Sequence, residues 1–303
     1  MSGKPVRVAA ASVALALGGQ AAGAAEVALV KSVETAAWAP AIAALRRTTA
    51  GHAVTEYDLR NDRAQGAAVL GPLKGRPLVV VAMGPVAAQA AREVLPDAPL
   101  VFCMVLDPPR AGLSIGPGVT GVSFRIPVKN QLAAYRMVYP RGTRLGVLYN
   151  EANVKAQVEE AEKAAGLLRL IVVSREVSSE RDVPAALRAL LTGADAVDAL
   201  WLPADPMLLG DATRRFLLSE SLKAGRPVFS FSAALVAEGA LASNGPDYSS
   251  IGEQAGELVN RVAAGEKRIE MLVPRAELVV NTRIAAKLRI DIPADALRAA
   301  RKF

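Results

Sequence analysis

The feature that most constrains this sequence is a regular alternation of short apolar runs and longer amphipathic segments, from residue 26 to about residue 245. The apolar runs, such as "PLVVVAMG" and "RLGVLYN", are rich in Val and Leu, and each precedes a segment whose apolar residues have helical spacing. Strands that are apolar on both faces predict a parallel sheet covered by helices on both sides. The sequence therefore predicts an α/β fold.

The alternation occurs in two series, which predicts two Rossmann-like lobes with parallel sheets. The first series ends after "PLVFCMVLD", and the second begins at "RLGVLYN", with "GVTGVSFRIP" between them. In sheets of this kind, ligands bind beyond the carboxyl ends of the strands. We therefore expect a functional site where the strand ends of the two lobes face a common crevice.

The N-terminus has the three parts of a secretory signal peptide. Two positive charges in "MSGKPVR" precede the apolar run "VAAASVALALGG", and the small residues of "QAAGAA" follow it. This pattern predicts a signal peptide over residues 1–25, cleaved near Ala24 or Ala25; the alternative is a buried N-terminal helix. The region contains no cysteine for a bacterial lipid anchor, so we expect an exported, periplasmic protein without one.

Composition argues against several classes of protein. The net charge is +7, but Lys and Arg are scattered and form no basic cluster, so we expect no nucleic-acid partner. The single histidine, His52, lies in a polar stretch, and the single cysteine, Cys103, lies in an apolar run, so catalytic triads and Cys/His metal sites are not expected. The turn "AMGPVAA" is not a nucleotide-binding loop. We predict no catalysis, metal or cofactor.

Single residues at the ends of the predicted strands, most of them polar or small, are the candidates for ligand contact. Each is also explained as a helix cap or a turn residue. The turn at Gly84 begins a predicted helix, whose free amides at residues 86–88 could hold a ligand carboxylate; the alternative is a plain corner turn. The candidates are Ser32, Glu34, Gly84, Pro85, Asp107, Asn150, Asn153, Asp205, Ser230, Phe231, Ser232, Asn244 and Tyr248.

Three long segments carry a resemblance to a known family: "GVTGVSFRIPVKNQLAAYRMVYPRGTRLGVLYNEANVKAQVEE", "DVPAALRALLTGADAVDALWLPAD" and "GALASNGPDYSSIGEQAGELV". The chain resembles ABC-transporter substrate-binding proteins of the tryptophan/tyrosine-uptake type, which have a type I periplasmic-binding-protein fold. The resemblance implies two lobes joined by three crossovers, with 26–124 plus 246–270 in the first lobe and 125–245 plus 271–303 in the second.

The same resemblance implies a function. A monomeric protein of this type closes its hinge on a small-molecule ligand and delivers it to a membrane permease. The alternative is a periplasmic sensory protein that uses the same lobes to pass ligand occupancy to a signalling receptor.

The chain departs from the family at positions that the resemblance places in the pocket. Pro85 and Leu106 stand where family members often have threonine, and Phe231 stands where they often have a small polar residue. Each change removes a hydrogen-bond donor or adds apolar surface. We therefore expect a ligand held by more hydrophobic contact and fewer hydrogen bonds, and weak binding of free tryptophan, tyrosine and phenylalanine. Asp107 and Asp205 match acidic positions of the family, and we expect one of them to pair with a cationic ligand group or to bridge the lobes on closure.

Overall fold

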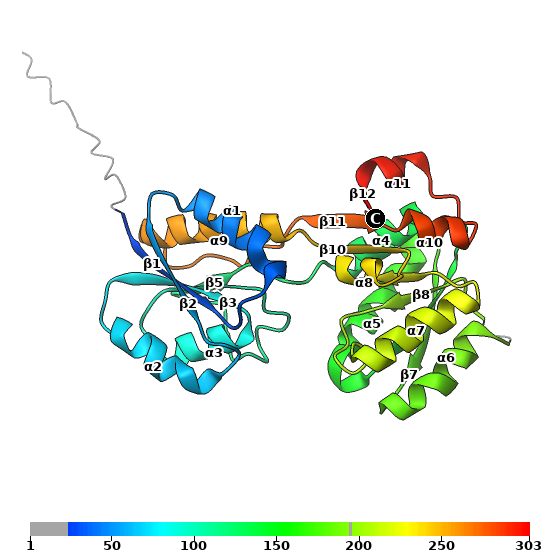
Figure 1. Cartoon of the computed structure of the whole chain (residues 1–303), viewed down its shortest axis with the longest axis horizontal. Helices are drawn as coiled ribbons and strands as arrows, with labels where there is room; N and C mark the ends of the chain where they lie inside the picture. The colour runs from blue at the N-terminus through cyan, green and yellow to red at the C-terminus, as the bar shows by residue number, and fades with distance from the viewer. Residues whose placement is uncertain (1–23, 194–195) are drawn as a thin grey trace, which may run out of the picture.

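The computed structural model describes residues 24–193 and 196–303. Two α/β lobes lie side by side, each a sheet with helices packed on both faces (Figure 1). This confirms the fold class predicted from the alternation of apolar runs and helices. The predicted signal peptide falls almost entirely outside the described residues, so its cleavage stays a prediction.

The first lobe is built on a five-stranded parallel sheet in the order β2-β1-β3-β4-β5. Helices α2 and α3 cover one face, while α1 and α9 cover the other, so the central strand β3 is buried along its whole length. The elements are β1 (Glu26–Lys31), α1 (Ala39–Thr48), β2 (Ala53–Asp58), α2 (Gly66–Leu70), β3 (Leu78–Met83), α3 (Pro85–Val94), β4 (Leu100–Cys103), β5 (Val119–Gly121) and α9 (Tyr248–Ala263), with 3₁₀ helices η1 (Ala36–Trp38), η2 (Arg63–Gln65) and η3 (Gly71–Leu73).

The second lobe is built on a seven-stranded sheet in the order β12-β11-β10-β9-β8-β6-β7. One face is covered by α4, α5, α10 and α11 and the other by α6, α7 and α8. The elements are α4 (Val128–Val138), β6 (Arg144–Tyr149), α5 (Glu151–Ala165), η4 (Gly166–Leu168), β7 (Ile171–Glu176), η5 (Glu180–Asp182), α6 (Val183–Leu191), β8 (Ala199–Leu202), α7 (Asp211–Lys223), β9 (Val228–Ser230), α8 (Ala233–Ala237), β10 (Ala242–Pro246), β11 (Ala276–Val280), α10 (Thr282–Lys287), α11 (Ala294–Ala299) and β12 (Arg301–Lys302).

The pairing of β10 with β11 is antiparallel, which the prediction of parallel sheets did not include. Pro246 at the carboxyl end of β10 lies opposite Ala276 at the start of β11. The chain passes from β10 into α9 of the first lobe and returns to the second lobe at β11. The chain returns at the end of the sheet that faces the first lobe, where β10 ends. β11 therefore begins at that end and runs in the direction opposite to β10.

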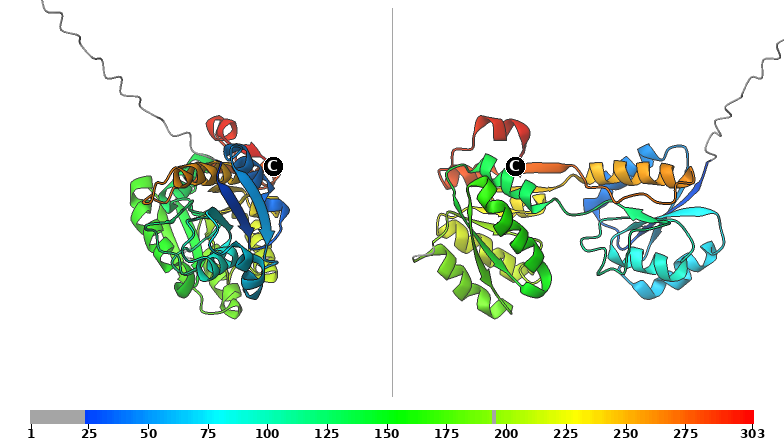
Figure 2. Two further views of the ribbon diagram at one scale, coloured as in Figure 1. Left: turned by 90° about the vertical axis from the view of Figure 1, so that its left-hand side faces the viewer. Right: turned by 180° about the vertical axis from the view of Figure 1, so that it is seen from behind.

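The chain crosses between the lobes three times, after β5, after β10 and before β11. These segments lie side by side in Figure 1 and Figure 2, and Val122 of the first crossover pairs with Leu272 of the third. Helix α9 is fixed to the first lobe at Gly252, where an added Cβ would lie 2.0 Å from the carbonyl oxygen of Ala41. The crossovers therefore place β10, the start of α9 and the segment after β5 at the boundary between the lobes.

Candidate functional site

A cavity of about 460 Å³ lies between the two lobes, beside the crossovers. The first lobe contributes Ala37 and Pro40 from η1 and α1, and the second contributes residues that follow β9. The remaining lining comes from the crossovers and from the β11–β12 edge. This volume lies within the range of about 300–1,000 Å³ that is typical of small-molecule sites.

Three aromatic residues contribute to the apolar lining of this cavity. Phe124 lies on the first crossover and Tyr248 is the first residue of α9; their ring centroids are 5.6 Å apart and the rings are tilted by 52°. Phe231 lines the cavity from the second lobe. Burial raises the pKa of the Tyr248 phenol, so this group remains a hydrogen-bond donor at neutral pH. The arrangement suits a ligand with a flat or bulky apolar body.

The charged groups that line the cavity are Asp247, Glu277 and Arg301. Asp247 is the N-cap of α9, where its Oδ1 accepts a hydrogen bond from the Ser249 amide at 2.9 Å. Arg301 donates to both carboxylate oxygens of Glu277, at 2.7 Å and 3.1 Å. Both ends of this bidentate pair are thus already matched within the protein.

A narrower crevice adjoins the cavity and shares Phe124, Phe231 and Pro246 with it. Its volume is about 10 Å³, which is room for one water-sized sphere. Leu106 of the first lobe and Ala204 of the second form part of its apolar wall. The polar residues of its lining are Arg125, Gln131, Gln157 and Asn244.

The structure brings four of the predicted site residues to this region. Phe231, Ser232 and Tyr248 line the cavity, and Asn244 joins Phe231 in the crevice. The Ser232 hydroxyl also accepts a hydrogen bond from the Ala234 amide at 3.3 Å, so it caps α8. Ser230 is fully buried, and its hydroxyl donates to the Ser232 carbonyl at 3.1 Å, which stabilises the turn between β9 and α8.

Sequence reasoning missed Phe124, Arg125 and Gln157. Phe124 and Arg125 belong to the segment "GVSFRIP", where no motif marks a binding residue and where the resemblance indicated only a hinge. Gln157 lies in the interior of α5, away from any strand end.

The turn at Gly84 is a packed corner, not an open anion site. Gly84 has φ +89°, and an added Cβ would lie 2.6 Å from Ser32 Oγ, so glycine is required here. The Ala87 amide donates to Ser32 Oγ at 2.9 Å, and the Ala88 amide donates to the Gly84 carbonyl at 3.1 Å. Pro85 is exposed and lies outside the cavity lining. Two of the three amides expected to hold a ligand carboxylate therefore have partners within the protein.

Asp205 is fully buried and holds the loops of the second lobe together. Its carboxylate accepts hydrogen bonds from the Asn150 amide at 2.6 Å, the Asn153 side chain at 2.8 Å and the Met207 amide at 3.0 Å. The Asn150 side chain in turn donates to the Val177 carbonyl at 3.0 Å. This geometry favours the capping interpretation of Asp205, Asn150 and Asn153 over direct ligand contact.

Asp107 also serves its own loop. Its Oδ1 accepts a hydrogen bond from the Arg110 amide at 3.2 Å, as in a turn. The Arg110 guanidinium continues across to the second lobe, where it donates to the Ala152 carbonyl at 3.2 Å. We expected Asp107 or Asp205 to bridge the lobes on closure. In this loop the contact between the lobes is made by Arg110, not by Asp107.

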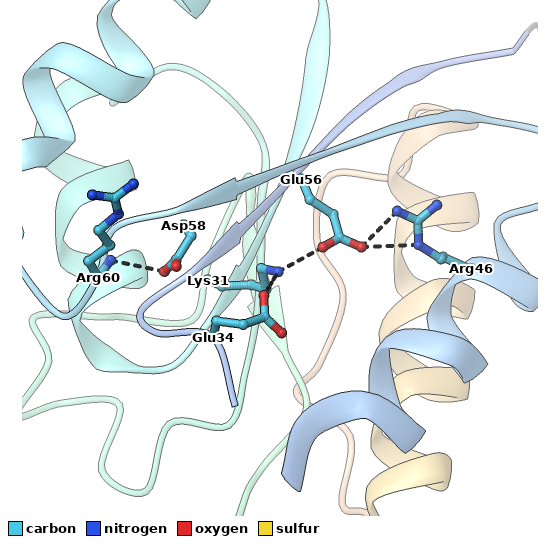
Figure 3. Close-up of polar contacts among 6 residues, drawn as sticks. All are labelled: Lys31, Glu34, Arg46, Glu56, Asp58 and Arg60. Atoms are coloured by element: carbon cyan, nitrogen blue, oxygen red, sulfur yellow. Dashed lines mark hydrogen bonds and ion pairs between the residues drawn. The ribbon is translucent and has the colours of Figure 1, made fainter. Parts of the chain in front are cut away.

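Glu34 belongs to a charge cluster at the carboxyl end of β1 (Figure 3). It pairs with Lys31, which is only 6% exposed and also donates to Glu56 at 2.8 Å. Arg46 of α1 completes the cluster by binding Glu56 at 2.7 Å. Burial opposes the Lys31 charge, but hydrogen bonds to Glu34 and Glu56 outweigh it and raise the pKa of Lys31. The cluster fastens β1, β2 and α1 to one another.

The single cysteine, Cys103, and the single histidine, His52, do not line the cavity or the crevice. Cys103 is buried, and burial raises the pKa of its thiol to about 12. His52 accepts a hydrogen bond from the Ala25 amide and contacts Asn260 at 3.0 Å, away from the cavity. Within residues 24–193 and 196–303, no three His, Cys, Asp or Glu side chains are grouped as metal ligands would be. In the same part of the chain, every helix is too short or too polar to cross a membrane.

Two α/β lobes, three crossovers and a cavity between the lobes define a type I periplasmic-binding-protein fold. The chain belongs to the ABC transporter substrate binding protein family, whose model matches residues 53–303. This membership confirms the resemblance to ABC-transporter substrate-binding proteins. Members of this family bind the substrates of ABC transporters.

A curated relative, the tyrosine-binding protein of Clostridioides difficile (strain R20291), is 28% identical over 213 residues. The match covers 67% of this chain and 60% of that protein, so it spans less than two thirds of the relative's length. Solved structures cover more of the chain. An ABC domain from Streptococcus pneumonia in complex with L-Trp has 24% identity and a TM-score of 0.66, and matches 92% of this chain and 99% of that one.

A second solved structure is the ligand-free, open form of a substrate-binding protein with adhesive properties from Clostridium difficile. It has 20% identity and a TM-score of 0.79, with the same coverage of 92% and 99%. At these identities the two solved structures establish the fold.

Proposed function

We propose that this protein is exported by its signal peptide and binds a small organic ligand between its lobes in the periplasm. It acts as a monomer, delivers the ligand to an ABC-transporter permease, and performs no catalysis. The observation that carries this proposal is the cavity of about 460 Å³ whose aromatic lining comes from both sides: Phe124 and Tyr248 from the first crossover and α9, and Phe231 from the second lobe.

A cavity of this kind supports capture by closure. Because its two walls belong to different lobes, rotation about the crossovers brings the Phe231 side toward Phe124 and Tyr248. A ligand in contact with both walls binds the closed form more tightly than the open form and shifts the protein toward closure. A closed, occupied form then differs in shape from the empty form, which gives a permease a means to distinguish them.

The lining supports a ligand with a larger apolar surface than a free amino acid offers. Phe231 and Leu106 stand where related proteins often have small polar residues or threonine, and both line this region. We propose that free tryptophan, tyrosine and phenylalanine bind weakly, whereas acids with an aromatic or branched apolar body and no ammonium group bind well.

The experiment is a thermal-shift screen of the mature chain against amino acids, aromatic acids and small carboxylates, followed by calorimetry of each stabilising compound. Ligands that bind only the folded state raise the melting temperature. Phe231→Ala should weaken binding by about tenfold or more, because it removes one aromatic wall. The matched control is Leu167→Ala, which truncates a side chain that is 75% exposed and lies outside the cavity lining. Equal affinities in Phe231→Ala and the unchanged protein would contradict binding at this cavity.

Export and delivery need measurements in cells. The secreted chain should begin near Ala25 or Glu26, and N-terminal sequencing that finds Met1 intact would contradict export by a signal peptide. Cells that lack this chain should lose uptake of the ligand found in the screen. Undiminished uptake would contradict delivery to a permease and favour the sensory alternative.

A further inference from the structure

An arginine without a protein partner lies at the junction of the two lobes. Arg125 belongs to the crossover between β5 and α4, is half-buried, and lines the narrow crevice beside the aromatic cavity. Its guanidinium makes no hydrogen bond or ion pair with any residue of 24–193 or 196–303. Partly desolvated arginines are usually paired, because removing the charge from water is costly unless an anion or acceptor replaces the water.

A second polar side chain in the same crevice is also unsatisfied. Gln157 projects from α5, is 5% exposed, and has a side-chain amide without a hydrogen bond anywhere in the described part of the chain. Asn244, which is 7% exposed, uses one amide hydrogen on the Asn130 carbonyl at 3.3 Å and retains the other. Polar groups in proteins are almost always hydrogen-bonded, to the protein or to water. These donors are not fully enclosed and open into the crevice, where a ligand oxygen can take the place of water.

The shape of the crevice limits what that partner can be. Its volume of about 10 Å³ admits one oxygen-sized group, not the body of a ligand. It shares Phe124 and Phe231 with the cavity of about 460 Å³, so a molecule can place one oxygen of its head group in the crevice and its apolar body in the aromatic cavity.

We propose that Arg125, supported by Gln157 and Asn244, binds the carboxylate of a ligand whose apolar body fills the aromatic cavity. This inference rests on the proposed function and assigns a subsite and a chemical class to it, an organic acid. The guanidinium supplies the charge and the two amides supply additional donors, a set that matches carboxylate oxygens and offers nothing comparable to an uncharged amide.

Other groups that could hold a carboxylate are already occupied in the described chain. The Ala87 and Ala88 amides at the start of α3 are bonded to Ser32 and Gly84. Arg301 at the cavity wall is held in two hydrogen bonds by Glu277. Of the two cationic residues that line the cavity and the crevice, Arg301 is paired with Glu277, whereas a ligand can engage Arg125 without first breaking an ion pair.

The test compares acids with their uncharged amides, which have nearly the same shape. The probes are 3-phenylpropionate with 3-phenylpropanamide, indole-3-acetate with indole-3-acetamide, and 4-methylpentanoate with 4-methylpentanamide. Each is titrated by calorimetry into the mature chain and into Arg125→Met, which keeps most of the side-chain volume but removes the charge. Arg141→Met is the matched control, because Arg141 is exposed on the loop after α4.

For at least one pair, the unchanged protein should bind the acid about tenfold or more tightly than the amide, since charge-assisted bonds are the stronger class. Arg125→Met should abolish that preference and leave the affinity for the amide unchanged, whereas Arg141→Met should change neither. Gln157→Glu should also abolish it, because the new carboxylate occupies Arg125. Melting temperatures of the variants establish that each remains folded.

The outcomes separate this inference from the function on which it rests. If acids and amides bind equally well, or if Arg125→Met retains the preference for acids, the carboxylate subsite is overturned while ligand binding in the cleft stands. If compounds of neither kind bind, although the protein is folded, both proposals fail.

Discussion

Replacing Asp205 by alanine should destabilise the second lobe and leave the intrinsic affinity for ligand nearly unchanged. The carboxylate is 0% exposed and accepts three hydrogen bonds, of 2.6, 2.8 and 3.0 Å. Its removal leaves three donors without their acceptor, two of them backbone amides of Asn150 and Met207. A hydrogen bond to a charged group contributes about 1.5–3 kcal/mol, and these share one carboxylate, so the loss of unfolding free energy should be roughly 3–5 kcal/mol.

The assay is urea unfolding followed by circular dichroism, together with calorimetry of ligand binding at a temperature where the variant is folded. Asp97→Ala, which truncates an exposed carboxylate of the first lobe, should stay within about 0.5 kcal/mol of the unchanged protein. A loss of ligand affinity of tenfold or more, with unfolding free energy unaltered, would refute the reasoning, because Asp205 would then be a ligand contact and not a loop cap.

Two further predictions concern the first lobe. Pro85→Thr should not improve the binding of any carboxylate, since the Ala87 amide is already bonded to Ser32, and calorimetry that finds tighter binding would show that the helix start faces the ligand. Glu56→Gln should lower the melting temperature at pH 7, because burial opposes the Glu56 charge but hydrogen bonds from Lys31 and then Arg46 lower the pKa of its carboxyl below the ordinary value of 4.5. A lowered pKa gives stability that is present above pH 4.5 and lost as the pH falls through the folded-state pKa, so the difference between variant and unchanged protein should shrink in acid; a constant difference in melting temperature from pH 7 down to pH 3 would contradict it.

The sequence predicts the strands and helices of this fold well because their signals are local. The segment from Leu78 to Val94 illustrates this, since an apolar run, a glycine and a proline are enough to place β3, the turn and α3. The antiparallel entry of β11 was not predictable in this way. The direction of β11 follows from the point at which the chain returns after α9. The residues of the strand itself, "AELVV", do not indicate whether it pairs parallel or antiparallel.

The candidate site was harder to predict because the partners of its residues are distant in sequence. Nothing near Gly84 indicates that Ser32, on another strand, occupies the amide of the helix start. Likewise, Asp205 at a strand end resembles a ligand-binding residue until Asn150 is seen to donate to it across the sheet. Phe231 was predicted because it follows a strand and because the family resemblance places that position in the pocket, whereas Arg125 on the crossover carried no such signal.

The central claim is that one ligand contacts both lobes, and small-angle X-ray scattering of the mature chain tests it most directly. A ligand held between Phe124 and Tyr248 on one side and Phe231 on the other stabilises a closed arrangement, so it must bring the lobes together. Saturation with an acid selected by the screen should reduce the radius of gyration, and Phe231→Ala should require a higher ligand concentration for the same reduction. A radius of gyration that stays constant through full calorimetric saturation would contradict the account, because the ligand would then be bound to one lobe alone.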